Sequence, residues 1–214
     1  MDIVDSRIER YMEDRLRRFD EPVLLEMEAY AEENGFPIVG RNVGVTLEVL
    51  ARSAGAARIM ELGSGFGYSA YWHARAAGSR GEVHLTDGDP ENEVRAAGYL
   101  ERAGLVDRIR FHVGDAVQEL GGLDGDFDLI FNDIDKDGYP AAWRAASDRI
   151  RTGGLYVCDN VLWYGRVAVE DPDDGRPQYT EAVLEHNRLV AEDERYVSTI
   201  VPTRDGVLVA IRVG

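Results

Sequence analysis

The chain of 214 residues is long enough for one α/β domain with a substantial core, and no Pro/Gly/Ser-rich linker divides it. Its formal net charge of −16 and pI near 4.6 would repel phosphate backbones and anionic lipids, so no nucleic acid or membrane partner is expected. Residues 1–20 are dense in Asp, Glu and Arg, and apolar runs are only strand-sized, so we expect a cytoplasmic protein. The single cysteine, Cys158, excludes an intramolecular disulfide.

The first 55 residues carry the pattern of helices. Apolar side chains recur at helical spacing at Ile8, Met12 and Leu16, and again at Leu24 and Met27. Prolines and a glycine interrupt this pattern, so it indicates two or three separate helices. We expect these helices to precede the main sheet.

From residue 58 the pattern changes to short apolar runs that alternate with helical stretches. These runs cover residues 58–62, 82–87, 108–113, 127–133 and 154–159, an alternation typical of βαβ units and a parallel sheet. Two further β-rich runs, 196–202 and 207–213, flank an Asp205-Gly206 pair that favours a tight reversal. The sequence therefore predicts an α/β fold in one domain, 1–214. Its helical segment, 1–55, precedes a core, 56–214, that holds a doubly wound, mostly parallel seven-stranded sheet ending in an antiparallel hairpin.

A glycine-rich segment follows the first expected strand. Glycines at Gly63, Gly65 and Gly67 let the backbone turn sharply and approach a ligand at the N-terminus of the next helix. The G-x-G-x-G spacing differs from the G-x-G-x-x-G of dinucleotide folds, and Glu61 lies two positions before the first glycine. Both features point away from NAD. The alternative is a glycine-rich turn that binds no ligand.

Two aspartates follow the next two expected strands. Asp87 ends the second strand, where a carboxylate can accept both hydroxyls of a ribose, and Asp115 follows the third, where it can reach an adenine amine. Either one alone could be an ordinary helix N-cap, but their shared position at successive strand ends favours an adenosine-shaped slot. Asp89 precedes a proline at the start of a helix and is better interpreted as an N-cap.

Oxygen-bearing side chains gather where the fourth and fifth expected strands end. Asp133 ends the fourth strand, and Asp159 and Asn160 end the fifth. If the strands are neighbours, these three side chains supply hard oxygen ligands that suit Mg2+, or Ca2+ and Mn2+, better than zinc or copper. The alternative is that the aspartates cap loops and that Asn160 occupies a left-handed turn.

The only lysine of the chain stands within this acidic segment. The other 23 basic residues are arginines. An arginine cannot release its proton near neutral pH, whereas a lysine beside a cation can. We therefore interpret Lys136 as a general base, with a solvated surface lysine as the alternative.

These motifs resemble the catechol and caffeoyl-CoA O-methyltransferase family of class I S-adenosylmethionine-dependent enzymes, whose core is Rossmann-like. The resemblance covers nearly everything after Ile38, and its specific part is the acid-x-acid-Lys segment together with Asp159-Asn160. The matching stretches are residues 61–69, 133–139, 159–160 and 184–212. Asn132 and Gly65-Phe66 depart from the usual pattern and bear on the shape of the pocket.

The resemblance implies S-adenosylmethionine as cofactor, Mg2+ as metal, a small phenolic substrate and a homodimer. It implies a metal site made of Asp133, Asp159 and Asn160, with Lys136 as the base. Together with the interpretation of the strand ends, the expected cofactor site comprises Val39, Glu61, Gly63, Ser69, Asp87, Asp115, Ala116 and Asp133.

We therefore expect methyl transfer to a hydroxyl of a catechol-like phenol, with the metal lowering the phenol pKa and Lys136 accepting the proton. A metal-independent methyltransferase, an NAD-dependent oxidoreductase and a non-catalytic binding protein of the same fold are the alternatives. The acidic, turn-forming stretch 170–175 is expected to be a mobile loop that closes over the site.

Overall fold

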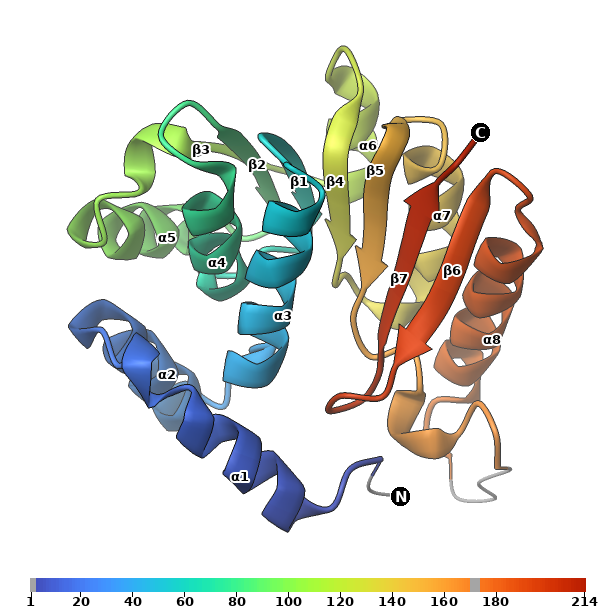
Figure 1. Ribbon diagram of the computed structural model, residues 1–214, viewed down its shortest axis with the longest axis horizontal. Helices are drawn as coiled ribbons and strands as arrows, with labels where there is room; N and C mark the ends of the chain where they lie inside the picture. Colours follow the sequence, from blue (N-terminus) through green and yellow to red (C-terminus); the bar gives the residue numbers. More distant parts are fainter. Residues whose placement is uncertain (1–2, 170–173) are drawn as a thin grey trace.

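A seven-stranded sheet with the order β3-β2-β1-β4-β5-β7-β6 forms the centre of the structure (Figure 1). The strands are β1 (Arg58–Leu62), β2 (Glu82–Asp87), β3 (Ile109–Val113), β4 (Phe127–Asn132), β5 (Ile150–Cys158), β6 (Tyr196–Val201) and β7 (Val207–Arg212). Strands β1 to β5 are parallel, whereas β7 runs antiparallel to both β5 and β6. The predicted mostly parallel sheet with a final antiparallel hairpin is confirmed.

The computed structural model describes residues 3–169 and 174–214. Most of the acidic stretch expected to form a closing loop, namely residues 170–173, lies outside the described residues. Within the part that is described, no helix combines the length and the apolar character needed to cross a membrane.

Helices cover both faces of the sheet, which makes the fold doubly wound (Figure 1). One apolar core joins the helices α2 to α5 to residues such as Ile59 of β1, and the other joins α6 to α8 to residues such as Met60. Adjacent strand residues point to opposite faces, so β1 serves both cores. The helices are α1 (Ser6–Arg15), α2 (Pro22–Asn34), α3 (Gly40–Ser53), α4 (Tyr68–Ala77), α5 (Pro90–Arg102), α6 (Ala116–Gly122), α7 (Tyr139–Ala146) and α8 (Pro177–Glu192), with short 3-10 helices η1 (Arg17–Phe19), η2 (Val106–Arg108), η3 (Lys136–Gly138) and η4 (Trp163–Gly165).

Strand β5 differs from its prediction because it begins at Ile150 instead of residue 154. The Gly153-Gly154 pair resembles a turn in the sequence, and Gly153 does adopt a left-handed φ of 77°. The pairing of β5 with β4 shifts register between Phe127 and Leu129, so the glycines lie within an irregular strand rather than before it.

The strand order determines at which edge of the sheet a ligand is expected to bind. Strand β1 is flanked by β2 on one side and β4 on the other, so the winding of the chain reverses direction at β1. Ligands of such sheets bind outside the carboxyl ends of the strands at this reversal. The carboxyl ends of β1, β4 and β5 are neighbours at the lower edge of the sheet in Figure 1.

Helices α3 and α4 pack closely beside this edge because a glycine faces a tryptophan. A methyl group added at Gly44 of α3 would lie 2.2 Å from Nε1 of Trp72 in α4. The Trp72 side chain is fully buried, so its ring has no solvent space into which to move. The close approach of these two helices therefore requires glycine at position 44.

We predict that Gly44→Ala lowers the free energy of unfolding by about 1–3 kcal/mol, the usual cost of overpacking a core. Gly98→Ala in α5 is the matched control, because a methyl group there meets nothing within 4 Å. That control should stabilise the helix by about 0.5–1 kcal/mol. Urea denaturation of both variants measures the difference. Equal stability of the two variants would contradict the tight contact between α3 and α4.

Candidate active site

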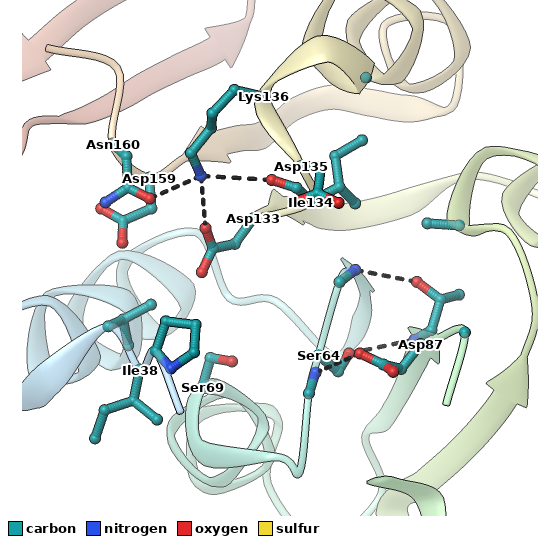
Figure 2. Close-up of a pocket in the computed structure, with 18 of the residues that line it drawn as sticks. Ile38, Ser64, Ser69, Asp87, Asp133, Ile134, Asp135, Lys136, Asp159 and Asn160 are labelled. Carbon is teal, nitrogen blue, oxygen red and sulfur yellow. Dashed lines mark hydrogen bonds and ion pairs between the residues drawn. The ribbon is translucent and has the colours of Figure 1, made fainter. Parts of the chain in front are cut away.

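A cavity of about 690 Å³ opens at the carboxyl edge of the sheet, and Figure 2 shows its lining. The loops that follow β1 to β5, the loop before α3 and the β6–β7 turn all contribute residues to it. This volume suits a cofactor together with a small substrate. Among the described lining residues six are aspartates, and only Lys136 and Arg204 are cationic. Such a cavity favours a ligand that carries positive charge.

The glycine-rich turn after β1 forms one end of the cavity. Gly63, Gly65 and Gly67 all adopt positive φ, of 81°, 49° and 89°. A methyl group at Gly63 would lie 2.7 Å from the carbonyl oxygen of Asp133, so the turn passes directly against the end of β4. The turn leads into α4, whose N-cap is Gly67. This is the arrangement expected for a loop that a ligand approaches closely.

The residues expected at the cofactor from the resemblance occupy two layers. Val39, Ser69 and Ala116 line the cavity. Glu61 is fully buried behind them and does not line it. The Ser69 hydroxyl donates a hydrogen bond to one carboxylate oxygen of Glu61, and Nδ1 of His73 lies 2.8 Å from the other. Glu61 thus holds the cavity wall in place from behind.

The aspartates at the ends of β2 and β3 both line the cavity. Asp87 accepts hydrogen bonds from the backbone N–H of Gly65 at 3.0 Å and from Nδ2 of Asn92 at 3.0 Å, which fix the orientation of its carboxylate. Asp115 also accepts a hydrogen bond from the N–H of Gln118 and caps α6, so its capping role and its place in the cavity coexist. Asp89 caps α5, as the sequence predicts, and does not line the cavity.

The ends of β4 and β5 bring together the three residues expected to bind a metal. The strands are paired up to Asn132 and Cys158, so Asp133 and Asp159 follow side by side. Asn160 adopts a left-handed φ of 55°, which turns the chain after β5 back towards the cavity. Figure 2 shows Asp133, Asp159 and Asn160 around the amine of Lys136. We call these four residues the acidic cluster.

Lys136 points into the acidic cluster, and its side chain is only 12% exposed. Its Nζ lies 2.8 Å from Oδ1 of Asn160, 3.3 Å from Oδ1 of Asp133 and 2.7 Å from the hydroxyl of Tyr139. That hydroxyl in turn donates a hydrogen bond to the carbonyl oxygen of Asp159 at 2.8 Å. Tyr139 therefore orients the lysine, a role that its sequence position at the start of α7 did not indicate.

The two carboxylates of the acidic cluster can carry more negative charge than the single ammonium group of Lys136 neutralises. Burial, and then the charge of Asp159, raise the pKa of Asp133 above its usual range, and burial raises that of Asp159. Asp159 is 1% exposed, and its Oδ1 has no hydrogen-bond partner among the described residues. Two carboxylates that share one ammonium group leave a site that a further cation would stabilise.

The donor set fits a hard divalent cation. Carboxylate and amide oxygens from Asp133, Asp159 and Asn160 are ligands that Mg2+, Ca2+ and Mn2+ accept. In residues 3–169 and 174–214, no three side chains of the His, Cys, Asp and Glu types gather closely enough to hold a metal. Besides the two carboxylates, the amide oxygen of Asn160 is the protein donor that the acidic cluster offers to a metal.

Three aromatic residues that follow β4 and β5 in the chain differ in their relation to the cavity. Tyr164 lines the cavity. Trp143 and Trp163 are buried at 3% and 9% exposure within the core formed by α7, α8 and the sheet. The backbone of Tyr164 is held by a hydrogen bond from its N–H to Oδ1 of Asp205.

Sequence reasoning missed Arg204, which lines the cavity from the β6–β7 turn. Its φ of 48° lies in the left-handed region, which costs a residue other than glycine on the order of 1 kcal/mol. Its Nη1 donates a hydrogen bond to the carbonyl oxygen of Ile38 at 2.5 Å. No motif marks this position, because its contact is made with a residue near the other end of the chain.

Comparison with known proteins identifies a family to which the sequence is similar. Residues 20–213 match the sequence model of the O-methyltransferase family. A catechol O-methyltransferase of Niastella koreensis is 35% identical over 170 residues, which cover 77% of this chain and 76% of that protein. Caffeoyl-CoA O-methyltransferase 1 of Eucalyptus globulus is 33% identical over 179 residues, covering 79% of this chain and 72% of that protein.

Solved structures of methyltransferases also superpose on nearly the whole chain. The O-methyltransferase TomG from Streptomyces achromogenes, in complex with SAM, has a TM-score of 0.85 and 26% identity, with 95% and 96% of the two chains covered. An O-methyltransferase from Bacillus cereus in complex with SAH has a TM-score of 0.85 and 27% identity, covering 96% of this chain and 97% of that one. On the extent of the family match and the identity with its members, this chain belongs to the O-methyltransferase family.

Proposed function

We propose that the protein transfers a methyl group from S-adenosylmethionine to a hydroxyl of a small catechol-like phenol, with Mg2+ as the metal and Lys136 as the general base. The observation that carries this proposal is the acidic cluster, in which two aspartates and an asparagine from adjacent strand ends surround one lysine. It shares its cavity with the glycine-rich turn and Asp87.

The glycine-rich end of the cavity suits the methyl donor. S-adenosylmethionine carries a sulfonium and an ammonium group, and the cavity is lined mainly by carboxylates. Asp87 and Asp115 face the cavity from successive strand ends, where they can accept hydrogen bonds from a ribose and an adenine. The SAM and SAH complexes of the similar structures support the same cofactor here.

The acidic cluster suits the phenol. A divalent cation held by Asp133, Asp159 and Asn160 supplies a positive charge that lowers the pKa of a phenol hydroxyl. The same positive charge favours the neutral amine of Lys136, which can then accept the phenol proton. Tyr139 and Asn160 hold Nζ of Lys136 at hydrogen-bond distance, so the base is positioned before the substrate binds.

Methyl transfer requires the phenol oxygen, the methyl carbon and the sulfur to lie in one line. A backbone contact between the glycine-rich turn and Asp133 supports such an alignment. The N–H of Asp133 donates a hydrogen bond to the carbonyl oxygen of Leu62 at 2.9 Å, and Gly63 packs against the carbonyl of Asp133. The cofactor turn and the first metal ligand therefore form one rigid unit.

The proposed activity is tested with labelled S-adenosylmethionine and catechol. We expect methylated product in the presence of Mg2+ and its loss after treatment with a chelator, with recovery when Mg2+ returns. Calorimetric titration should detect binding of S-adenosylhomocysteine and none of NAD. Turnover that is insensitive to the chelator would instead favour a metal-independent methyltransferase in which the aspartates orient the substrate.

We predict that Asp159→Asn abolishes metal binding without unfolding the protein, because it removes a buried charge at nearly constant volume. At a metal concentration on the order of 100 times Kd, linkage gives the wild type roughly 2.7 kcal/mol of stabilisation and a rise in Tm of about 5–10 °C. The variant should show no such rise. Asp137→Asn is the control, since Asp137 is an exposed acid of η3 that lines the same cavity but is no member of the acidic cluster. A metal-induced rise that survives in Asp159→Asn would exclude the acidic cluster as the site.

We predict that Lys136→Arg lowers kcat by about 100-fold or more, because arginine keeps the charge but cannot accept a proton near neutral pH. The Kd of S-adenosylhomocysteine should stay the same, since Nζ of Lys136 contacts Asp133, Tyr139 and Asn160 rather than the glycine-rich turn. Activity of the variant should rise more steeply with pH than that of the wild type, because hydroxide ionises the phenol. Full turnover at neutral pH would remove Lys136 from the role of base.

A further inference from the structure

Arg204 is a cationic side chain in the cavity that the proposed reaction does not use. Its turn is held rigidly against the loop that carries Asp159 and Asn160. The backbone N–H of Leu162 donates to the carbonyl oxygen of Asp205 at 2.9 Å, and that of Val161 donates to the carbonyl oxygen of Gly206 at 3.1 Å. Arg204 is therefore placed beside the acidic cluster, where the phenol would bind.

The guanidinium of Arg204 links two segments that line the cavity. Its Nη1 donates to the carbonyl oxygen of Ile38, which lines the cavity from the loop before α3. Arg204 lines the same cavity as Asp159 and Asn160. Arg204 thus connects two walls of the cavity on the side of the metal ligands.

Arg204 retains unused hydrogen-bond donors. Within the described part of the chain it forms no salt bridge, and its Nε and Nη2 make no hydrogen bond. Lys136, the other cation of the cavity, already contacts Asp133, Tyr139 and Asn160. An anion that enters this cavity among six aspartates therefore finds one cationic group with donors to spare, which is Arg204.

We infer that Arg204 selects the acceptor by binding an anionic substituent, so that the phenol methylated by this protein carries a carboxylate on or near its ring. This inference rests on the proposed function. A guanidinium offers a planar pair of N–H donors that match the two oxygens of a carboxylate. Without Arg204, the surrounding aspartates would repel such an acceptor.

The strained backbone of Arg204 agrees with a functional side chain. A left-handed φ of 48° suits glycine at this place in the turn, yet an arginine stands there. Glycine would make the same turn without strain, so Arg204→Gly removes the guanidinium and leaves the turn free to form. This variant separates recognition of the substrate from folding.

The test compares 3,4-dihydroxybenzoate with 3,4-dihydroxybenzaldehyde, which has a similar shape and no charge. We expect Arg204→Gly to lower the ratio of kcat/KM for benzoate to that for benzaldehyde by about ten-fold, mainly through KM for benzoate, as expected for loss of a charged hydrogen-bonded contact. Arg204→Lys, which keeps the charge but not the planar pair of donors, should retain part of the ratio. Tm of both variants should confirm that they are folded.

An unchanged ratio in Arg204→Gly would overturn the inference, as would an equal loss for both acceptors, which indicates a structural role. Caffeoyl-CoA is a third acceptor, with a neutral thioester in place of the carboxylate and phosphates farther away. A loss confined to caffeoyl-CoA would place a phosphate against Arg204 and overturn the carboxylate assignment. If the wild type binds S-adenosylhomocysteine but methylates none of the three acceptors, the proposed function fails and this inference fails with it.

Discussion

The site depends on a shortage of positive charge between two strand ends. Asp133 and Asp159 are forced together because β4 and β5 pair up to the residues just before them. One ammonium group, that of Lys136, lies among these carboxylates, and burial raises the pKa of both aspartates. Such an arrangement is costly in a cation-free fold and becomes favourable when a cation is bound. Binding of a cation to the acidic cluster would therefore be strongly favourable.

The pairing of β1 with β4 sets where the donor and the acceptor of the proposed reaction would lie. The glycine-rich turn follows β1 and Asp133 follows β4, the strand next to it in the sheet, so the turn at Gly63 lies against the backbone of Asp133. A side chain at position 63 would separate the two, since its Cβ would lie 2.7 Å from the Asp133 carbonyl oxygen. In the proposed reaction, the glycine would therefore serve the alignment of donor and acceptor as well as the approach of the cofactor.

The charges that line the cavity affect cationic and anionic ligands differently. A lining dominated by carboxylates is suited to a cationic methyl donor and discourages anions. Arg204 adds a positive charge to this lining from the β6–β7 turn, where we infer that the phenol rather than the cofactor lies. The net negative charge of the whole chain therefore does not decide which small molecule the cavity binds. A bound molecule interacts mainly with the charges nearest to it.

Sequence alone determined most of the sheet and the identity of the acidic cluster. The periods of apolar residues are local signals, so the strand ranges near 58–62, 82–87 and 207–213 agree with β1, β2 and β7. The rule that parallel strands present their carboxyl ends at one edge was enough to predict that Asp133 and Asp159 would meet.

Only the tertiary structure decided which residues face the cavity and which support it. Glu61 precedes the glycine turn, yet it lies behind Ser69 because the packing of α4 on β1 places that helix between Glu61 and the cavity. Tyr139 is held by a contact with the loop after β5, and Arg204 by a contact with Ile38. Both partners are distant in sequence from the residue that they hold. Such contacts leave no periodic or spacing signal, since they exist only after the sheet has brought distant segments together.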